Sequence, residues 1–167
     1  MIAYLLFNPL ANNGKGEQFK DEALNELKDT YEELVEKNVL ELEKDDFVKK
    51  LKKEDKIILV GGDGTLNHFA NEMYELKLEN EFYIYRAGTG NDFLRDIRAE
   101  EKLVFLNPYL EKLPKVCING KETYFINGIG FGIDGMVCEV ADDLKAKGET
   151  NINYTSIAIK LLLTKYK

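Results

Sequence analysis

Side chains that bind metals or form disulfide frameworks are scarce in this sequence. The 167 residues include two cysteines and one histidine. Cys117 and Cys138 lack the spacing of metal ligands, and we expect both to be reduced thiols, as is usual in a cytosolic protein. Internal repeats and low-complexity segments are also absent. Nothing here indicates an architecture held together by disulfides or metal ions.

An excess of basic charge is missing as well. The formal net charge is −7 and the pI is near 4.9. Proteins that bind nucleic acids usually carry a basic stripe, and a polybasic patch is typical of proteins attracted to anionic membranes. The sequence has neither feature, so we expect no nucleic-acid partner.

The sequence also lacks a hydrophobic run long enough to cross a bilayer, which takes about 20 residues. Residues 1–7 are apolar, but no basic residue precedes them, so they indicate a buried first strand rather than a signal peptide. Hydrophobic residues make up 44% of the chain, which is enough for a buried core. We therefore expect a globular protein in the cytoplasm.

Strand and helix patterns alternate through the first hundred residues. Strands are predicted at residues 2–7, 38–42, 57–60 and 82–85, and helices at residues 19–35, after Asp45, and at residues 64–78. The third strand is fully apolar, as a strand covered on both faces should be. This order predicts an α/β fold with a mostly parallel sheet and helices on both faces.

The pattern changes in the last third of the chain. Residues 115–118 and 123–127 predict a β-hairpin, because Asn119 and Gly120 between them are the favoured pair for a turn with two positive φ angles. Antiparallel structure after a parallel sheet indicates the start of a second domain.

We expect the domain boundary after residue 113, which gives domains over residues 1–113 and 114–167.

A helix is predicted at residues 136–145. The last pattern is an apolar stripe at helical spacing, formed by Tyr154, Ile157, Ala158, Leu161 and Leu162. Such a stripe needs a partner surface, so a homo-oligomer is expected to form through it.

Two glycine-rich segments follow predicted strands. Residues 60–67 read Val-Gly-Gly-Asp-Gly-Thr-Leu-Asn, and residues 87–92 read Ala-Gly-Thr-Gly-Asn-Asp. Glycines let backbone N–H groups approach an anion closely, and the helix that follows turns its positive end to the same place. Asp63 supplies one metal-bridging acid. Because both segments leave the C-terminal ends of strands, we expect them to enclose one polyanion such as a triphosphate.

Two other glycine-rich segments point to ligands less strongly. Residues 11–16 are not a Walker motif, which would need a glycine at Pro9 and a serine or threonine at Gly16. Residues 130–135 match G-x-G-x-x-G before a helix, but they follow a hairpin rather than a first βαβ unit. A glycine-rich crossing between two domains is favoured there over a dinucleotide site.

Asn8-Pro9, residues 61–67, and residues 88–93 with Arg95 occur together in that order. Together they resemble the catalytic domain of the diacylglycerol kinase family, which includes sphingosine and ceramide kinases. The resemblance implies an α/β nucleotide domain of phosphofructokinase or NAD kinase-like type, followed by a lipid-binding β-sandwich. That sandwich is normally much longer than residues 114–167, so the second domain is expected to be incomplete.

The resemblance also implies an activity. A kinase of this family transfers the γ-phosphate of ATP to a lipid hydroxyl, diacylglycerol-like, with Mg²⁺ and during transient association with a membrane surface. It gives Asp63 and Asp92 catalytic roles, with Asp63 also facing the metal. It gives nucleotide contacts to Asn8, Gly62, Asp63, Gly64, Thr65, Asn67 and Thr89.

Structural roles compete with several of these assignments. Asp63 suits a helix cap, Asp92 suits a cap held through Arg95, and Asn8 suits an ordinary turn before proline. Lys15 is better explained as a surface lysine than as a phosphate ligand. His68 stands where relatives usually carry glutamate, and we favour an exposed helix residue over a catalytic base.

Two other functions remain open. One is a nucleotide-binding module without turnover, as a truncated or degenerate relative would be. No motif in the sequence offers a convincing general base for a lipid hydroxyl. The other is an NAD kinase-like activity, which shares residues 61–64 but fits residues 88–93 poorly.

Overall fold

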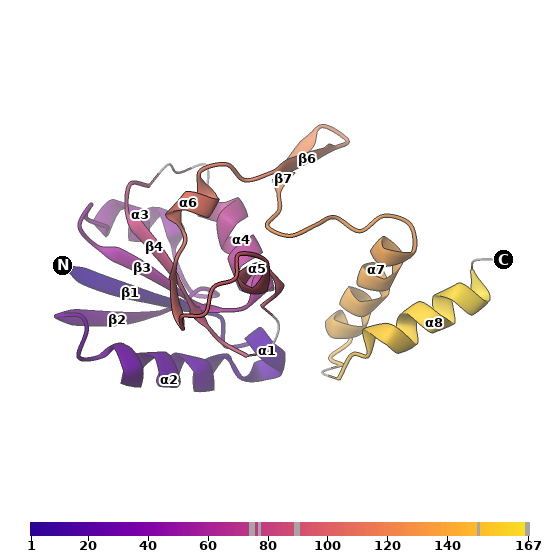
Figure 1. Ribbon diagram of the computed structural model, residues 1–167, viewed down its shortest axis with the longest axis horizontal. Helices are drawn as coiled ribbons and strands as arrows, with labels where there is room; N and C mark the ends of the chain where they lie inside the picture. Colours follow the sequence, from indigo (N-terminus) through magenta and orange to yellow (C-terminus); the bar gives the residue numbers. More distant parts are fainter. Residues whose placement is uncertain (74–75, 77, 89–90, 150, 166–167) are drawn as a thin grey trace. The chain divides into compact units, whose positions relative to one another are not determined.

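The computed structural model describes residues 1–73, 76, 78–88, 91–149 and 151–165. It forms two compact units, Met1–Asn127 and Gly128–Lys167, which are described separately below (Figure 1). The hairpin after residue 113 belongs to the first unit by its contacts. The division into domains after residue 113 stays a prediction.

A five-stranded sheet forms the centre of the first unit. Its strands are β1 (Ile2–Phe7), β2 (Glu33–Asn38), β3 (Lys56–Gly61), β4 (Glu81–Arg86) and β5 (Leu103–Phe105), in the spatial order β2-β1-β3-β4-β5. The first four strands are parallel, and only β5 pairs antiparallel, with β4. The predicted α/β fold with a mostly parallel sheet is confirmed.

Helices cover both faces of this sheet, because the central strands are apolar on both sides. Ile57 and Leu59 of β3 face one buried cluster, whereas Ile58 and Val60 face the other. The first cluster includes side chains of α3 (Lys44–Lys50), α4 (Asp63–Met73), α5 (Asp92–Asp96) and the loop before α6 (Asn107–Leu110). The second includes Ala23 and Leu27 of α2 (Gly16–Leu27).

The prediction for β2 was wrong. The first long helix ends at Leu27 rather than residue 35, and the strand occupies residues 33–38 rather than 38–42. This strand lies at the edge of the sheet and pairs only with β1. An edge strand keeps charged residues such as Glu33 and Glu36, and these look like the polar face of a helix in the sequence.

Two helix boundaries also differ from the predictions. The sequence suggests a loop over residues 12–16, but Ala11–Gly14 form the short helix α1. The helix predicted over residues 64–78 is α4, which is assigned from Asp63 to Met73; residues 74, 75 and 77 lie outside the described residues.

A hairpin of β6 (Lys115–Ile118) and β7 (Lys121–Tyr124) ends the first unit's regular structure. Asn119 has φ +53° and Gly120 has φ +81°, so both central turn residues are left-handed, as a two-residue hairpin loop requires. The predicted hairpin is therefore confirmed, with its second strand at Lys121–Tyr124 rather than at residues 123–127.

The second unit contains two packed helices, α7 (Ile133–Ala146) and α8 (Tyr154–Thr164). Within the predicted apolar stripe, Leu161 is buried, whereas Leu162 is 51% exposed. Part of the stripe therefore finds its partner in α7 of the same chain, and self-association stays a prediction. Among the described residues, no helix combines the length and apolar character needed to cross a membrane.

Candidate functional site

Three loops gather where the parallel strands end. β1 leads into α1, β3 leads into α4, and β4 leads into α5, and Figure 1 shows these three helices at one end of the sheet. The chain moves from β1 to one neighbour, β2, and later to the other neighbour, β3. Parallel sheets bind ligands outside the strand ends at such a reversal of strand order.

Asp63 connects two of these loops. Its Oδ2 accepts a hydrogen bond from the Asp92 N–H at 2.8 Å, and its Oδ1 accepts one from the Phe93 N–H at 3.1 Å. These N–H groups open α5 and have no partner inside that helix. Asp63 therefore caps a helix 29 residues further along the chain, and the two glycine-rich motifs meet as their strand positions predicted.

The Asp63 carboxylate keeps the capacity to bind a cation. A carboxylate has about four lone-pair sites, and the two backbone N–H groups use one on each oxygen. Across the described parts of the chain, no three His, Cys, Asp or Glu side chains form a metal-binding group. Mg²⁺ does not need one, because it retains several waters and takes one or two carboxylates. The donor set at Asp63 fits a hydrated Mg²⁺ ion.

Asp92 lies in the first turn of α5, and its N–H donates a hydrogen bond to the Asp63 carboxylate. Its exposed side chain forms an ion pair with Arg95, which is three residues further along the helix. The pairing with Arg95 is present as the sequence suggested, but the N–H groups that open α5 are accepted by Asp63 rather than by the Asp92 side chain.

The loop after β1 is built around Asn8. The Asn8 Oδ1 accepts the Leu10 N–H at 2.9 Å, and the Asn8 carbonyl accepts the Ala11 N–H at 3.0 Å. A Cβ at Gly16 would lie 1.9 Å from the Asn8 carbonyl oxygen, so only glycine lets α2 start this close. Asn8 thus holds its own turn, and Lys15 is exposed.

Asn12 is a site residue that the sequence did not reveal. It has φ +52°, and its Nδ2 donates to the Ala87 carbonyl across a distance of 3.4 Å. A Cβ at Gly88 would lie 2.8 Å from Asn12 Oδ1. The loops after β1 and β4 therefore touch, although their strands are separated by β3. Asparagine tolerates the left-handed conformation better than most residues, but that signal alone does not identify its distant partner.

Gly61 allows the first turn of α4 to pack against the end of β3. A Cβ at Gly61 would lie 2.4 Å from Thr65 Oγ1. Gly62 precedes the helix, and its carbonyl accepts the Leu66 N–H at 3.1 Å. Gly64 is exposed and Thr65 is half-buried, whereas Thr89 lies outside the described residues.

Asn67 and Asn91 carry the other amide groups near these loops. The Asn67 carbonyl accepts a hydrogen bond from Asn71. Asn91 is only 5% exposed, and its Nδ2 donates to the Gly88 carbonyl at 3.1 Å. Its buried Oδ1 has no hydrogen-bond partner among the described residues. The loop before α5 therefore contains a polar atom that a ligand hydroxyl or a water can satisfy.

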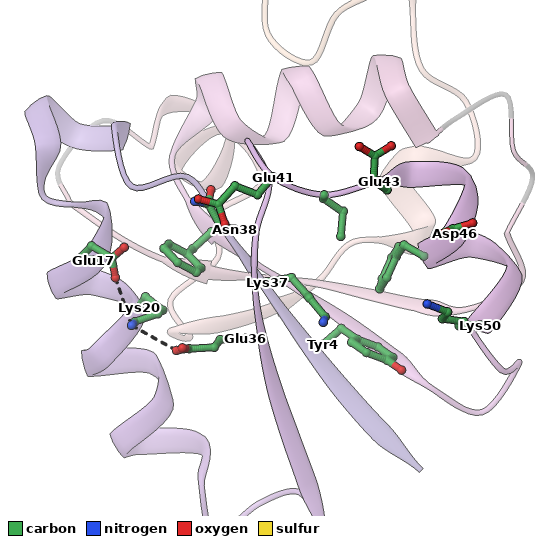
Figure 2. A pocket seen from close by; sticks show the side chains of 13 residues that line it. Tyr4, Glu17, Lys20, Glu36, Lys37, Asn38, Glu41, Glu43, Asp46 and Lys50 are labelled. Atoms are coloured by element: carbon green, nitrogen blue, oxygen red, sulfur yellow. Dashed lines mark ion pairs between the residues drawn. The ribbon is translucent and has the colours of Figure 1, made fainter.

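A groove of about 740 Å³ runs along the edge of the sheet, between β1, β2 and α3 (Figure 2). Phe7, Leu42 and Phe47 supply apolar surface. Five carboxylates and three lysines also line it: Glu17, Glu36, Glu41, Glu43, Asp46, Lys20, Lys37 and Lys50. The excess of negative charge makes this groove unsuitable for phosphates.

Lys20 is held by carboxylates of the groove itself. Its Nζ lies 3.1 Å from the Oε2 atoms of both Glu17 and Glu36 (Figure 2). The same Nζ lies over the ring of Phe7. Burial lowers the pKa of Lys20, but hydrogen bonds with Glu17, Asp21 and Glu36 outweigh it and hold the pKa above its usual value. The lysine therefore stays charged and is fully engaged by its carboxylate neighbours.

Comparison with known proteins connects these features to a family. A family model described as "Diacylglycerol kinase catalytic domain" matches residues 2–113. Proteins named "Putative lipid kinase" from two strains of Staphylococcus epidermidis are 27% identical over 120 residues, which is 68% of this chain and 38% of each relative. The chain thus spans well under half the length of these curated relatives.

A solved structure shows the same fold. The crystal structure of a "putative diacylglycerol kinase" from Bacillus anthracis matches with a TM-score of 0.56 at 22% identity, over 98% of this chain and 54% of that one. The family match covers well over half of the sequence, including both glycine-rich motifs and the Asp63 cap between them. The chain belongs to the diacylglycerol kinase catalytic domain family, a family of lipid kinases.

Proposed function

We propose that this chain supplies the ATP site of a lipid kinase that transfers the γ-phosphoryl group to a lipid alcohol, diacylglycerol-like. The observation that supports it most is the bond between motifs, in which the Asp63 carboxylate accepts N–H groups of Asp92 and Phe93. This contact joins the two glycine-rich loops at one end of the sheet. An activity on membrane lipids implies that the protein works at a membrane surface from the cytoplasm.

In this proposal the triphosphate lies at the N-terminus of α4. The helix has 11 residues, and the first N–H groups after Gly62 have no partner inside it. They donate to phosphate oxygens, and the helix dipole adds favourable potential. Thr65 contributes its hydroxyl, and Asn8, Asn67 and Thr89 complete the contacts that the family resemblance assigns.

Mg²⁺ is proposed to lie beside the Asp63 oxygens, through their remaining lone pairs or a bound water. When bound, it neutralises charge on the β- and γ-phosphates. Asp63 then holds the loop before α5 and the metal at once. Asp92 is proposed to orient the acceptor hydroxyl, once its side chain leaves Arg95.

The base and ribose are proposed to lie toward the groove between β1, β2 and α3. Its apolar surface suits an aromatic base. Its carboxylates repel phosphate but can accept hydrogen bonds from ribose hydroxyls. Phe7, the last residue of β1, lines the groove and pairs in register with Val60 of β3. Because β3 leads into α4, the groove and the loop before α4 are neighbours. One nucleotide can therefore use both features.

The proposal is tested by titrating the protein with ATP and Mg²⁺ in a calorimeter, and then assaying transfer of labelled γ-phosphate to diacylglycerol in vesicles. Binding together with transfer supports it. Binding without transfer supports a nucleotide-binding module, and transfer to NAD instead supports an NAD kinase-like activity. A folded sample that binds no nucleotide overturns the proposal.

A further inference from the structure

Asn71 joins two distant segments of the chain through both the oxygen and the nitrogen of its side-chain amide. Its Oδ1 accepts the Tyr124 N–H at 2.9 Å, and its Nδ2 donates to the Tyr124 carbonyl at 2.8 Å. The second hydrogen on Nδ2 donates to the Asn67 carbonyl at 2.9 Å. The partners Asn71 and Tyr124 are 53 residues apart in the sequence.

The orientation of this amide follows from its partners. Both groups near Nδ2 are carbonyl oxygens, which only accept, and the group near Oδ1 is an N–H, which only donates. A rotated amide would direct its oxygen at two carbonyl oxygens. Asn71 therefore acts like a neighbouring strand residue, offering Tyr124 one acceptor and one donor.

This contact has a clear structural purpose for the β6–β7 hairpin. A two-stranded hairpin alone is marginally stable in water, and it presents unpaired backbone groups along its edges. Tyr124, the last residue of β7, pairs with Lys115 of β6 on one side and with the Asn71 amide on the other. Two residues later, Ile126 packs against the core.

We propose that Asn71 is a positioning residue, which fixes the β6–β7 hairpin to the helix whose first turn holds the phosphates. This inference rests on the proposed function. Asp63 and Asn71 are eight residues apart on α4, which corresponds to about 12 Å of helix. A helix transmits this spacing rigidly. The hairpin, and the chain that leaves the first unit after Asn127, therefore start at a fixed place relative to Asp63.

The first test is hydrogen exchange at the Tyr124 amide, without nucleotide. Asn71→Ala is expected to speed this exchange about tenfold or more, because the amide loses its acceptor. Buried β3 amides, such as that of Ile58, should keep their protection and show that the sheet is intact. Glu72→Ala is the matched control, since Glu72 is the next residue on α4 and pairs with Lys44 and His68 instead.

Asn71→Asp separates hydrogen bonding from packing. Aspartate has the same shape, but its second oxygen would face the carbonyls of Asn67 and Tyr124. If the hydrogen bonds position the hairpin, exchange at Tyr124 in Asn71→Asp is at least as fast as in Asn71→Ala. Wild-type exchange in Asn71→Asp would mean that only shape matters, and would overturn the inference.

The second test is kinetic, using phosphoryl transfer from ATP to diacylglycerol in vesicles. Asn71→Ala is expected to lower kcat at least fivefold and to leave the KM for ATP within about twofold, because the first turn of α4 is untouched. An unchanged kcat overturns the positioning role. If the wild-type protein transfers no phosphate, the proposed function fails, whereas the exchange measurements still decide whether Asn71 holds the hairpin.

Discussion

At the scale of single residues, Asp63 has two tasks that are separable. Its carboxylate closes the start of α5, and its remaining lone pairs face the proposed metal. Asp63→Asn keeps the shape but replaces one accepting oxygen with a donor that faces a backbone N–H. We expect exchange at the Asp92 and Phe93 amides to rise about tenfold without any nucleotide, since hydrogen bonds to a charged acceptor contribute about 1.5–3 kcal/mol.

The same substitution should lower phosphoryl transfer by orders of magnitude while the fold stays intact. Asp45→Asn, an exposed change in the first turn of α3, serves as the control with the same chemistry. Wild-type exchange at Asp92 and Phe93 in Asp63→Asn would show that the cap is unimportant. A wild-type transfer rate would show that Asp63 is structural alone.

Substitution of Gly61 and of Gly64 by alanine should change the free energy of unfolding in opposite directions. A Cβ at Gly61 meets Thr65 at 2.4 Å, so Gly61→Ala is expected to lower the free energy of unfolding by about 1–3 kcal/mol. A Cβ at Gly64 meets no atom within 4 Å, and alanine favours a helix, so Gly64→Ala should raise it by about 0.5–1 kcal/mol. Chemical denaturation of both variants measures the difference. Equal effects would contradict the close packing of α4 on β3.

At the scale of elements, the pairing of β3 with β4 carries a pH-dependent contribution. Glu81 of β4 pairs in register with Lys56 of β3, at 2.8 Å between Oε2 and Nζ. Hydrogen bonds from Lys56 and then Tyr83 lower the pKa of the Glu81 carboxyl below its ordinary value of 4.5. A lowered carboxyl pKa stabilises the fold above the unfolded-state pKa, and this stabilisation is lost as the pH falls through the folded-state pKa.

The midpoint temperature of thermal unfolding should therefore decrease as the pH is lowered below about 4.5 in the wild type. It should decrease less steeply with pH in Glu81→Gln. The pair is partly exposed, so its contribution is about 0.5 kcal/mol. Glu100→Gln, at an exposed residue, should leave the wild-type slope unchanged. A steeper slope in Glu81→Gln would reverse the predicted sign.

Some of the strands could be predicted closely from the sequence, and others could not. The apolar strands β1, β3 and β4 were predicted within a residue or so, because strands buried on both faces carry a strong signal. The edge strand β2 was misplaced, because its charged residues resemble a helix face. For the site, strand order alone brought the two glycine-rich motifs to one edge.

The specific contacts could not be predicted. The Asp63 cap on α5, the Asn12 contact with Ala87 and the Asn71 contact with Tyr124 join residues between 29 and 75 positions apart. No periodicity records such pairs, since they exist only once the strands are assembled. Each involves a short polar side chain bonded to backbone, which fits either a local turn or a distant loop equally well in the sequence.

At the scale of the whole molecule, the first unit should be independent of the second. Nearly all the buried apolar residues lie in the first unit, whereas Ala141 and Leu161 are the buried residues assigned to α7 and α8. We expect residues 1–127 alone to unfold cooperatively, with a midpoint within a few degrees of the full chain. Residues 128–167 alone should show little stable helix, because two short helices bury too little surface. Calorimetry and circular dichroism check both fragments, and an unfolded 1–127 fragment would contradict the division.

A single nucleotide site is expected where the loops after β3 and β4 meet at Asp63. Calorimetric titration of the full chain with ATP and Mg²⁺, for wild type and Asp63→Asn, tests this most directly. The expected result is one ATP site per chain, with affinity lowered at least tenfold in Asp63→Asn. A folded wild-type sample that releases no heat of binding, or a variant that binds as tightly as wild type, would contradict it.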